Sequence, residues 1–126
     1  MFVKLMKSKI HTAKVTESKL NYEGSITIDA ELIEKANFFI GEKVQVLNKH
    51  TGDRIETYVI EGERNSGEIC LNGPAARNGE IGDEVIIISY AFMSPEEAEE
   101  FEPTVLFIDG NNKIKNKKWE NLLLFF

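Results

Sequence analysis

The 126-residue sequence contains one cysteine, Cys70, and two histidines, His11 and His50. A single cysteine allows no intrachain disulfide and no zinc site built from several thiolates. The histidines have no carboxylate cluster at ligand spacing around them, so we expect no metal site. The scarcity of cysteine is typical of proteins from a reducing compartment, and the expected location is the cytoplasm.

Long apolar runs and an excess of basic residues are also missing. The longest aliphatic or apolar runs, Val85–Ile88 and Leu122–Phe126, are far shorter than the ~18 residues that indicate a membrane-spanning helix. The N-terminal residues alternate lysine with apolar side chains, a pattern that predicts no signal peptide. Lys and Arg number 15 and Asp and Glu number 21, for a net charge of −6, which argues against nucleic-acid and anionic-membrane partners. Phosphate-binding loops and nucleophile-elbow motifs are absent as well.

The sequence instead offers short runs rich in β-branched residues, separated by turn residues. They predict a small, mostly antiparallel β-barrel or sandwich, with strands at 9–15, 25–29, 43–48, 54–60, 68–71, 85–92 and 104–108. Two short helices are expected between them. Asp29 is placed to cap the first, whose apolar face contains Leu32, Ile33 and Ala36. Ser94 is placed to cap the second, with Pro95 in its first turn and Glu97 as the capping-box partner.

Polar residues recur at strand spacing. Lys9 and His11 share one face of a strand, and Arg54, Glu56 and Tyr58 share one face of another, opposite Thr57. Spacing alone is more often that of an ordinary solvated face than of a site. The step from Gly24 to Ser25 at a strand entry has two interpretations. It is either a tight turn into the strand or a bend that lets the Ser25 hydroxyl attack the Gly24 carbonyl.

The sequence resembles the bacterial aspartate 1-decarboxylase family, pyruvoyl-dependent enzymes that make β-alanine for pantothenate. The residues that carry the resemblance are 9–11, 15–16, 20–29, 57–58, 62–64, 72–73, 75–77, 82–83 and 85–88. The match runs in register to about Asn112, so we expect one domain over residues 1–112. Residues 113–126 form a Lys-rich, apolar-ended tail of unknown structure, either disordered or docked on a barrel.

The resemblance implies a mainly β fold, a six-stranded double-psi β-barrel with short helices, assembled as a homotetramer with active sites between subunits. It implies an inactive proenzyme that cleaves itself between Gly24 and Ser25 and converts Ser25 into a pyruvoyl group. The ketone of that group would form a Schiff base with L-aspartate and accept the electrons released with carbon dioxide. Neither pyridoxal phosphate nor a metal would be needed.

The resemblance also assigns roles to individual residues. Lys9 and Arg54 would bind the retained carboxylate of aspartate and orient the substrate. Tyr58 would return a proton after carbon dioxide leaves, and Thr57 would contact substrate and assist self-cleavage. The other expected site residues are Asn72 and the turn Gly73-Pro74-Ala75, which orient substrate and pyruvoyl oxygens, and His11 and Tyr22, which line the wall.

Pro74 replaces the alanine usual in the family, so its backbone nitrogen cannot donate a hydrogen bond, and an amide contact there must come from Gly73 or Ala75. Cys70 is expected to be a buried structural thiol.

Two alternatives to this function stay open at the level of sequence. The chain could be a β-barrel binding module that is unprocessed or inactive, or a decarboxylase of a related amino acid. A 24-residue and a 102-residue fragment on denaturing mass spectrometry would favour the enzyme, and an intact chain would favour the module.

Overall fold

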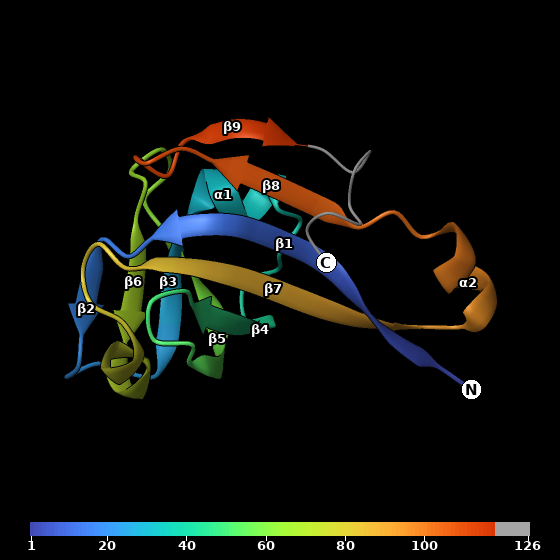
Figure 1. Ribbon diagram of the computed structural model, residues 1–126, viewed down its shortest axis with the longest axis horizontal. Helices are drawn as coiled ribbons and strands as arrows, with labels where there is room; N and C mark the ends of the chain where they lie inside the picture. The colour runs from blue at the N-terminus through green and yellow to red at the C-terminus, as the bar shows by residue number, and fades with distance from the viewer. Residues whose placement is uncertain (118–126) are drawn as a thin grey trace.

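The computed structural model describes residues 1–117, whose strands wrap around one another (Figure 1). Their buried side chains form a mainly aliphatic core. In chain order the elements are β1 (Val3–Lys14), β2 (Glu17–Lys19), β3 (Ser25–Asp29), α1 (Ala30–Lys35), β4 (Lys43–Asn48), β5 (Arg54–Gly62), β6 (Ile69–Asn72), the 3₁₀-helix η1 (Gly73–Asn78), β7 (Glu84–Met93), α2 (Pro95–Glu100), β8 (Thr104–Ile108) and β9 (Ile114–Lys117). Among these described elements, no helix is long and apolar enough to cross a membrane.

The strands of the described residues form one mixed sheet in the order β2-β6-β3-β5-β4-β7-β1-β8-β9. Most neighbours are antiparallel, but β1 pairs with β8, β2 with β6 and β3 with β5 in parallel. The predicted mainly β class with short helices is confirmed. The strand count exceeds the six of the predicted barrel, because segments as short as the three residues of β2 also pair at the edges of the sheet.

The predicted strands at 25–29, 43–48 and 104–108 have the same bounds in the structure. The first strand was predicted to begin at Lys9, but β1 begins at Val3 and pairs with β7 from there. The tail begins with a strand, β9, that the sequence did not predict and that pairs with β8. The remainder of the tail, residues 118–126, lies outside the described residues.

Both predicted helix caps are confirmed. The Asp29 carboxylate accepts a hydrogen bond from the Glu31 backbone nitrogen and also binds the nitrogens of Asn65 and Gly67, so it ties α1 to the turn before β6. Ser94 and Glu97 form a capping box at the start of α2.

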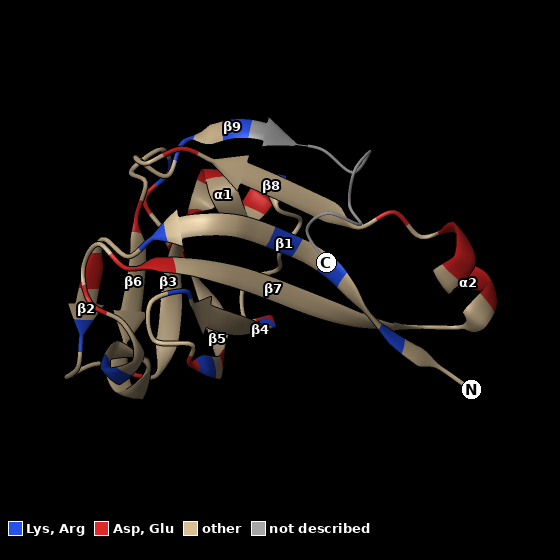
Figure 2. Ribbon diagram, viewed as in Figure 1, with Lys and Arg blue, Asp and Glu red and all other residues tan. Residues whose placement is uncertain are grey.

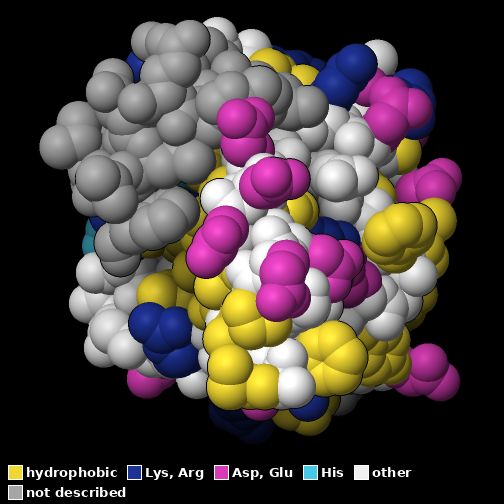
Figure 3. Space-filling view, turned by 90° about the vertical axis from the view of Figure 1, so that its right-hand side faces the viewer, with side chains coloured by type: hydrophobic (Ala, Val, Ile, Leu, Met, Phe, Trp, Pro, Cys, Tyr) yellow, Lys and Arg dark blue, Asp and Glu magenta, His cyan; other side chains and the backbone are white. Residues whose placement is uncertain are grey.

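The second helix carries a concentration of negative charge. Figure 2 shows α2 as the most acidic element, and Figure 3 shows these carboxylates gathered on one end of the molecule. Along the long axis, α2 lies at the opposite end from β2, β3 and β6 (Figure 1). The acidic surface is therefore remote from the strand that begins at Ser25.

The packing of the core determines which side chains of β3 and β6 can contribute to a functional site. Ile26 and Ile28 face Leu71 and Ile69 across the antiparallel pair, and all four are fully buried. Each such side chain contributes roughly 1.5–3 kcal/mol to the free energy of unfolding. Because successive strand residues point to opposite faces, the residues between them form a second, polar face.

Candidate active site

The polar face of β3 and β6 is made of Ser25, Thr27, Cys70 and Asn72. In the antiparallel register Ser25 lies opposite Asn72, and Thr27 lies opposite Cys70. The Asn72 amide nitrogen donates to the Ser25 hydroxyl at 3.0 Å and to the Thr27 hydroxyl at 2.8 Å. One amide therefore holds two hydroxyl oxygens on the neighbouring strand.

The Ser25 hydroxyl is held from two directions. Its oxygen accepts the bond from Asn72, and its proton is donated to the Glu23 carbonyl at 3.1 Å. The side chain is 1% exposed, so water does not compete for these bonds. These two hydrogen bonds fix the serine oxygen next to the peptide bond that precedes it. An attack on the Gly24 carbonyl needs a hydroxyl held in such a position.

Gly73 brings a second segment of backbone against residues 22 to 24, directly before this peptide bond. Its φ of +62° is in the left-handed region, and a Cβ there would lie 2.5 Å from the Tyr22 carbonyl oxygen and 2.8 Å from the Gly24 nitrogen. Only glycine therefore permits this approach. The predicted turn at Gly73-Pro74-Ala75 is the first turn of η1, with Pro74 at a position where no backbone donor is required.

A pocket of about 340 Å³ opens beside this peptide bond. It brings together five of the sequence-predicted residues with three others, and its lining is Gly24, Ile55, Glu56, Thr57, Tyr58, Pro74, Ala75 and Asn78. Tyr58 is 43% exposed, so its ring is at a wall that solvent and a small ligand can reach. The buried Ser25 is absent from this lining and follows Gly24 directly in the chain.

Arg54, Lys9 and His11 do not line this pocket, although Arg54 lies on the strand that supplies Thr57 and Tyr58. Lys9 and His11 lie on β1. Arg54 is exposed at the start of β5, where its guanidinium donates to Gln45 at 2.8 Å. Lys9 is buried on β1, and this burial lowers the pKa of its ammonium group. Burial, and after it the charges of Lys9 and Lys49, lower the pKa of His11, so its imidazole is neutral at pH 7.

Thr27 and Cys70 are contacts of Asn72 that the sequence did not assign to the site. Cys70 is 1% exposed, as predicted for a structural thiol, but its sulfur is also 3.2 Å from the Asn72 side-chain oxygen. The available signal was alternation, because Thr27 is two residues from Ser25 and Cys70 two residues from Asn72. Alternation alone could not reveal that the two strands pair in this register.

A mainly β chain with a small open pocket lined by polar side chains fits a small enzyme. A model of the aspartate decarboxylase family matches residues 1–115, and the chain belongs to this family. It is 58% identical over 120 residues to an aspartate 1-decarboxylase of Acetivibrio thermocellus, covering 95% of each chain. It is 59% identical to that of Thermoanaerobacter pseudethanolicus, covering 89% of this chain and 96% of the relative.

The comparison with solved structures is more distant. A rationally designed protein, mkDPBB_sym_86, matches with a TM-score of 0.47 and 15% identity, over 61% of this chain and 90% of the designed one. The family assignment rests on the sequence relatives.

Proposed function

We propose that this chain is a pyruvoyl-dependent decarboxylase that converts L-aspartate to β-alanine and carbon dioxide for pantothenate and coenzyme A biosynthesis. Its membership of the aspartate decarboxylase family supports the reaction and weighs against a binding module. The observation that carries the proposal is the hydrogen bond from Asn72 to the buried Ser25 hydroxyl, next to a glycine that lines a pocket. The cytoplasm is proposed as the compartment, since the lone Cys70 thiol suits a reducing environment.

Self-cleavage would begin at Ser25. Its oxygen adds to the Gly24 carbonyl, the peptide C–N bond breaks, and the hydroxyl proton passes to the departing nitrogen, leaving an ester. A base then removes the Cα proton of residue 25, and the Cβ–Oγ bond breaks with its electron pair on the oxygen, which leaves in the Gly24 carboxylate. Tautomerisation and hydrolysis by water release ammonia and leave the pyruvoyl group at the new N-terminus.

The residues around Ser25 fit a pyruvoyl group. The Asn72 amide donates a hydrogen bond to the serine oxygen, at the place where the group would form. Gly73 has no side chain, so the backbone around Gly24 can lie against it. When formed, the group supplies a ketone that accepts electrons during loss of carbon dioxide. Thr57 and Tyr58 line the pocket, where Thr57 would contact the substrate and the Tyr58 hydroxyl would return a proton to carbon.

Charge in the pocket supports a site shared between subunits. Aspartate brings two carboxylates. The charged group among the residues that line the pocket is Glu56, whose negative charge repels them. Lys9 and Arg54 lie elsewhere on the same chain, and we propose that a neighbouring subunit brings such cations to the pocket. The enzyme would then be a homotetramer, which light scattering on the processed protein tests. An active monomer would exclude the shared site.

Denaturing mass spectrometry with a carbonyl-reactive probe tests the function directly. We expect fragments of 24 and 102 residues, with the probe on the larger one. Carbon dioxide release is then measured on a panel that includes aspartate and glutamate, and aspartate should be preferred. An intact chain that forms no β-alanine would refute the proposed function, and preference for glutamate would change its substrate.

A further inference from the structure

A chain of hydrogen bonds runs from Cys70 through Asn72 to Ser25. The Cys70 sulfur is 3.2 Å from the Asn72 side-chain oxygen, and the Asn72 nitrogen is 3.0 Å from the Ser25 hydroxyl oxygen. We propose that Cys70 is a positioning residue for self-cleavage, because its thiol determines which way the Asn72 amide faces. This inference rests on the proposed function and adds a residue to it.

The direction of the Asn72 amide decides whether the Ser25 oxygen receives a hydrogen-bond donor or faces another oxygen. With its nitrogen toward β3, Asn72 donates to both Ser25 and Thr27. A flipped amide would present its oxygen to these hydroxyls and its two N–H groups to sulfur, which is a weak acceptor. The Ser25 proton could then go to Asn72 instead of to the Glu23 carbonyl, which accepts it now. A thiol that donates therefore favours the arrangement with the amide nitrogen on Ser25.

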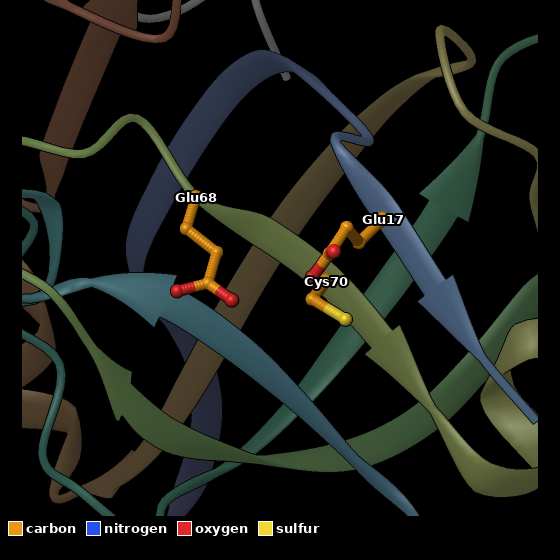
Figure 4. Close-up of side chains that lie close together, drawn as sticks. All are labelled: Glu17, Glu68 and Cys70. Atoms are coloured by element: carbon orange, nitrogen blue, oxygen red, sulfur yellow. The ribbon is translucent and has the colours of Figure 1, made fainter. Parts of the chain in front are cut away.

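The surroundings of Cys70 keep its proton on sulfur. Burial, and after it the Glu17 carboxylate, raise the pKa of the thiol. Glu17 lies opposite Cys70 in the parallel pair of β2 and β6, and Glu68 precedes β6 on the same face (Figure 4). The Cys70 sulfur and one carboxylate oxygen from each of Glu17 and Glu68 lie within 4.8 Å of one another. Two carboxylates beside the sulfur disfavour a thiolate, so the thiol stays a donor to Asn72.

The Asn72 donor matters most when the Cβ–Oγ bond breaks. Negative charge then develops on the oxygen that departs with Gly24, and an N–H aimed at it stabilises that charge. Loss of the Cys70 donor leaves Asn72 in place but lets a fraction of its amides face the other way. We therefore expect slower cleavage, by about three- to tenfold for one hydrogen bond, and not a complete loss.

The test compares three substitutions at Cys70 by the rate at which freshly synthesised chain is cut, followed by mass. Cys70→Ser retains a donor and should cleave within about twofold of the parent. Cys70→Ala and Cys70→Val should be about three- to tenfold slower. Cys70→Ala combined with Asn72→Ala should be no slower than Asn72→Ala alone, because both changes remove the same contact.

Folding is controlled by measuring the thermal midpoint of each variant in a Ser25→Ala background, where no variant can cleave. Cys70→Val fills the buried volume, so slow cleavage with a parental midpoint supports the donor role. Cys70→Ala that cleaves at the parental rate would overturn the inference, and so would a slow Cys70→Ser of parental stability. If the parent chain itself does not cleave, the proposed function fails, an outcome distinct from a normally cleaving parent with unaffected Cys70 variants.

Discussion

Asn72 lies directly opposite Ser25 in the antiparallel pair of β3 and β6, with its amide nitrogen 3.0 Å from the serine oxygen. The contact is a product of strand register. A slip of β3 by one residue would turn Ile26 away from the core and Ser25 toward it. The same apolar residues that stabilise the sheet therefore place the amide on the hydroxyl.

Removal of the Ser25 oxygen should stop maturation. We expect Ser25→Ala to remain one folded, uncleaved chain without decarboxylase activity, because alanine has no atom that can attack Gly24. Ser66→Ala is the matched control, since it removes an exposed hydroxyl that binds the Glu63 carbonyl away from the site. Intact mass and β-alanine formation are measured on both variants. Cleavage of Ser25→Ala between residues 24 and 25 would exclude the mechanism.

Maturation and turnover should separate at Tyr58. Its hydroxyl is assigned to protonating carbon after decarboxylation, a step absent from self-cleavage, so Tyr58→Phe should still cleave and still react with a carbonyl probe. Its rate of β-alanine formation should fall by ~10²- to 10⁴-fold. Tyr90→Phe, which removes a hydroxyl bound to Gln45, should stay within a few-fold of the parent. Near-normal turnover of Tyr58→Phe would remove Tyr58 as the acid, whereas failure to cleave would place its role in maturation.

Gly73 should be the more sensitive of two glycines with positive φ. Gly73→Ala adds a methyl 2.5 Å from the Tyr22 carbonyl oxygen, whereas Gly52→Ala, at φ +78°, meets nothing within 4 Å. Gly52→Ala should lower the free energy of unfolding by about 1–2 kcal/mol from backbone strain alone, and Gly73→Ala by at least about 3 kcal/mol. Urea unfolding in a Ser25→Ala background measures both. Equal losses would show that the close approach at Gly73 is not rigid.

Asp83 should contribute to the acid sensitivity of the fold. The backbone nitrogen of Glu80, and after it the Asn48 side-chain amide, donate to its carboxylate and hold the pKa of Asp83 below its usual 3.8. A carboxyl whose pKa is lower in the folded state stabilises the fold above pH 3.8, and this stability is lost as the pH falls through the folded value. Asp83→Asn should therefore lose stability at pH 7 and differ less from the parent near pH 2. Unfolding curves at the two pH values test this, and an equal difference at both would contradict it.

Much of the strand framework was predictable from local sequence. Alternating β-branched runs bounded by turn residues gave the bounds of three strands, and Asp29 and Ser94 marked both helix starts. The beginning of β1 was missed because residues 3–8 mix lysine with apolar side chains, and the pairing with β7 decides their conformation. β2 and β9 are only three and four residues long, too short to produce a periodic signal.

The candidate site was predictable as a set of residues but not as an arrangement. The Gly24-Ser25 step and the pair Thr57-Tyr58 were identified from the family resemblance, and Gly24 lines one pocket with both of them. The contacts of Asn72 with Thr27 and Cys70 depend on the register of β3 and β6, which a single sequence does not specify. The sequence likewise does not specify that Arg54, which directly precedes the pocket residue Ile55, binds Gln45 and does not line the pocket.

The place of β1 in the sheet has a consequence for the processed protein. Residues 1–24 contain β1, which lies between β7 and β8, and β2, which pairs with β6. Cleavage after Gly24 would turn one chain into a complex of two, held by main-chain bonds to other strands and by the burial of Ile10, Ala13 and Val15. Dissociation of the two pieces adds a concentration dependence to the thermal midpoint of such a complex, a contribution that the uncleaved chain lacks. Dilution after unfolding would separate the two pieces, and a strand from the middle of the sheet would have to be recaptured by diffusion.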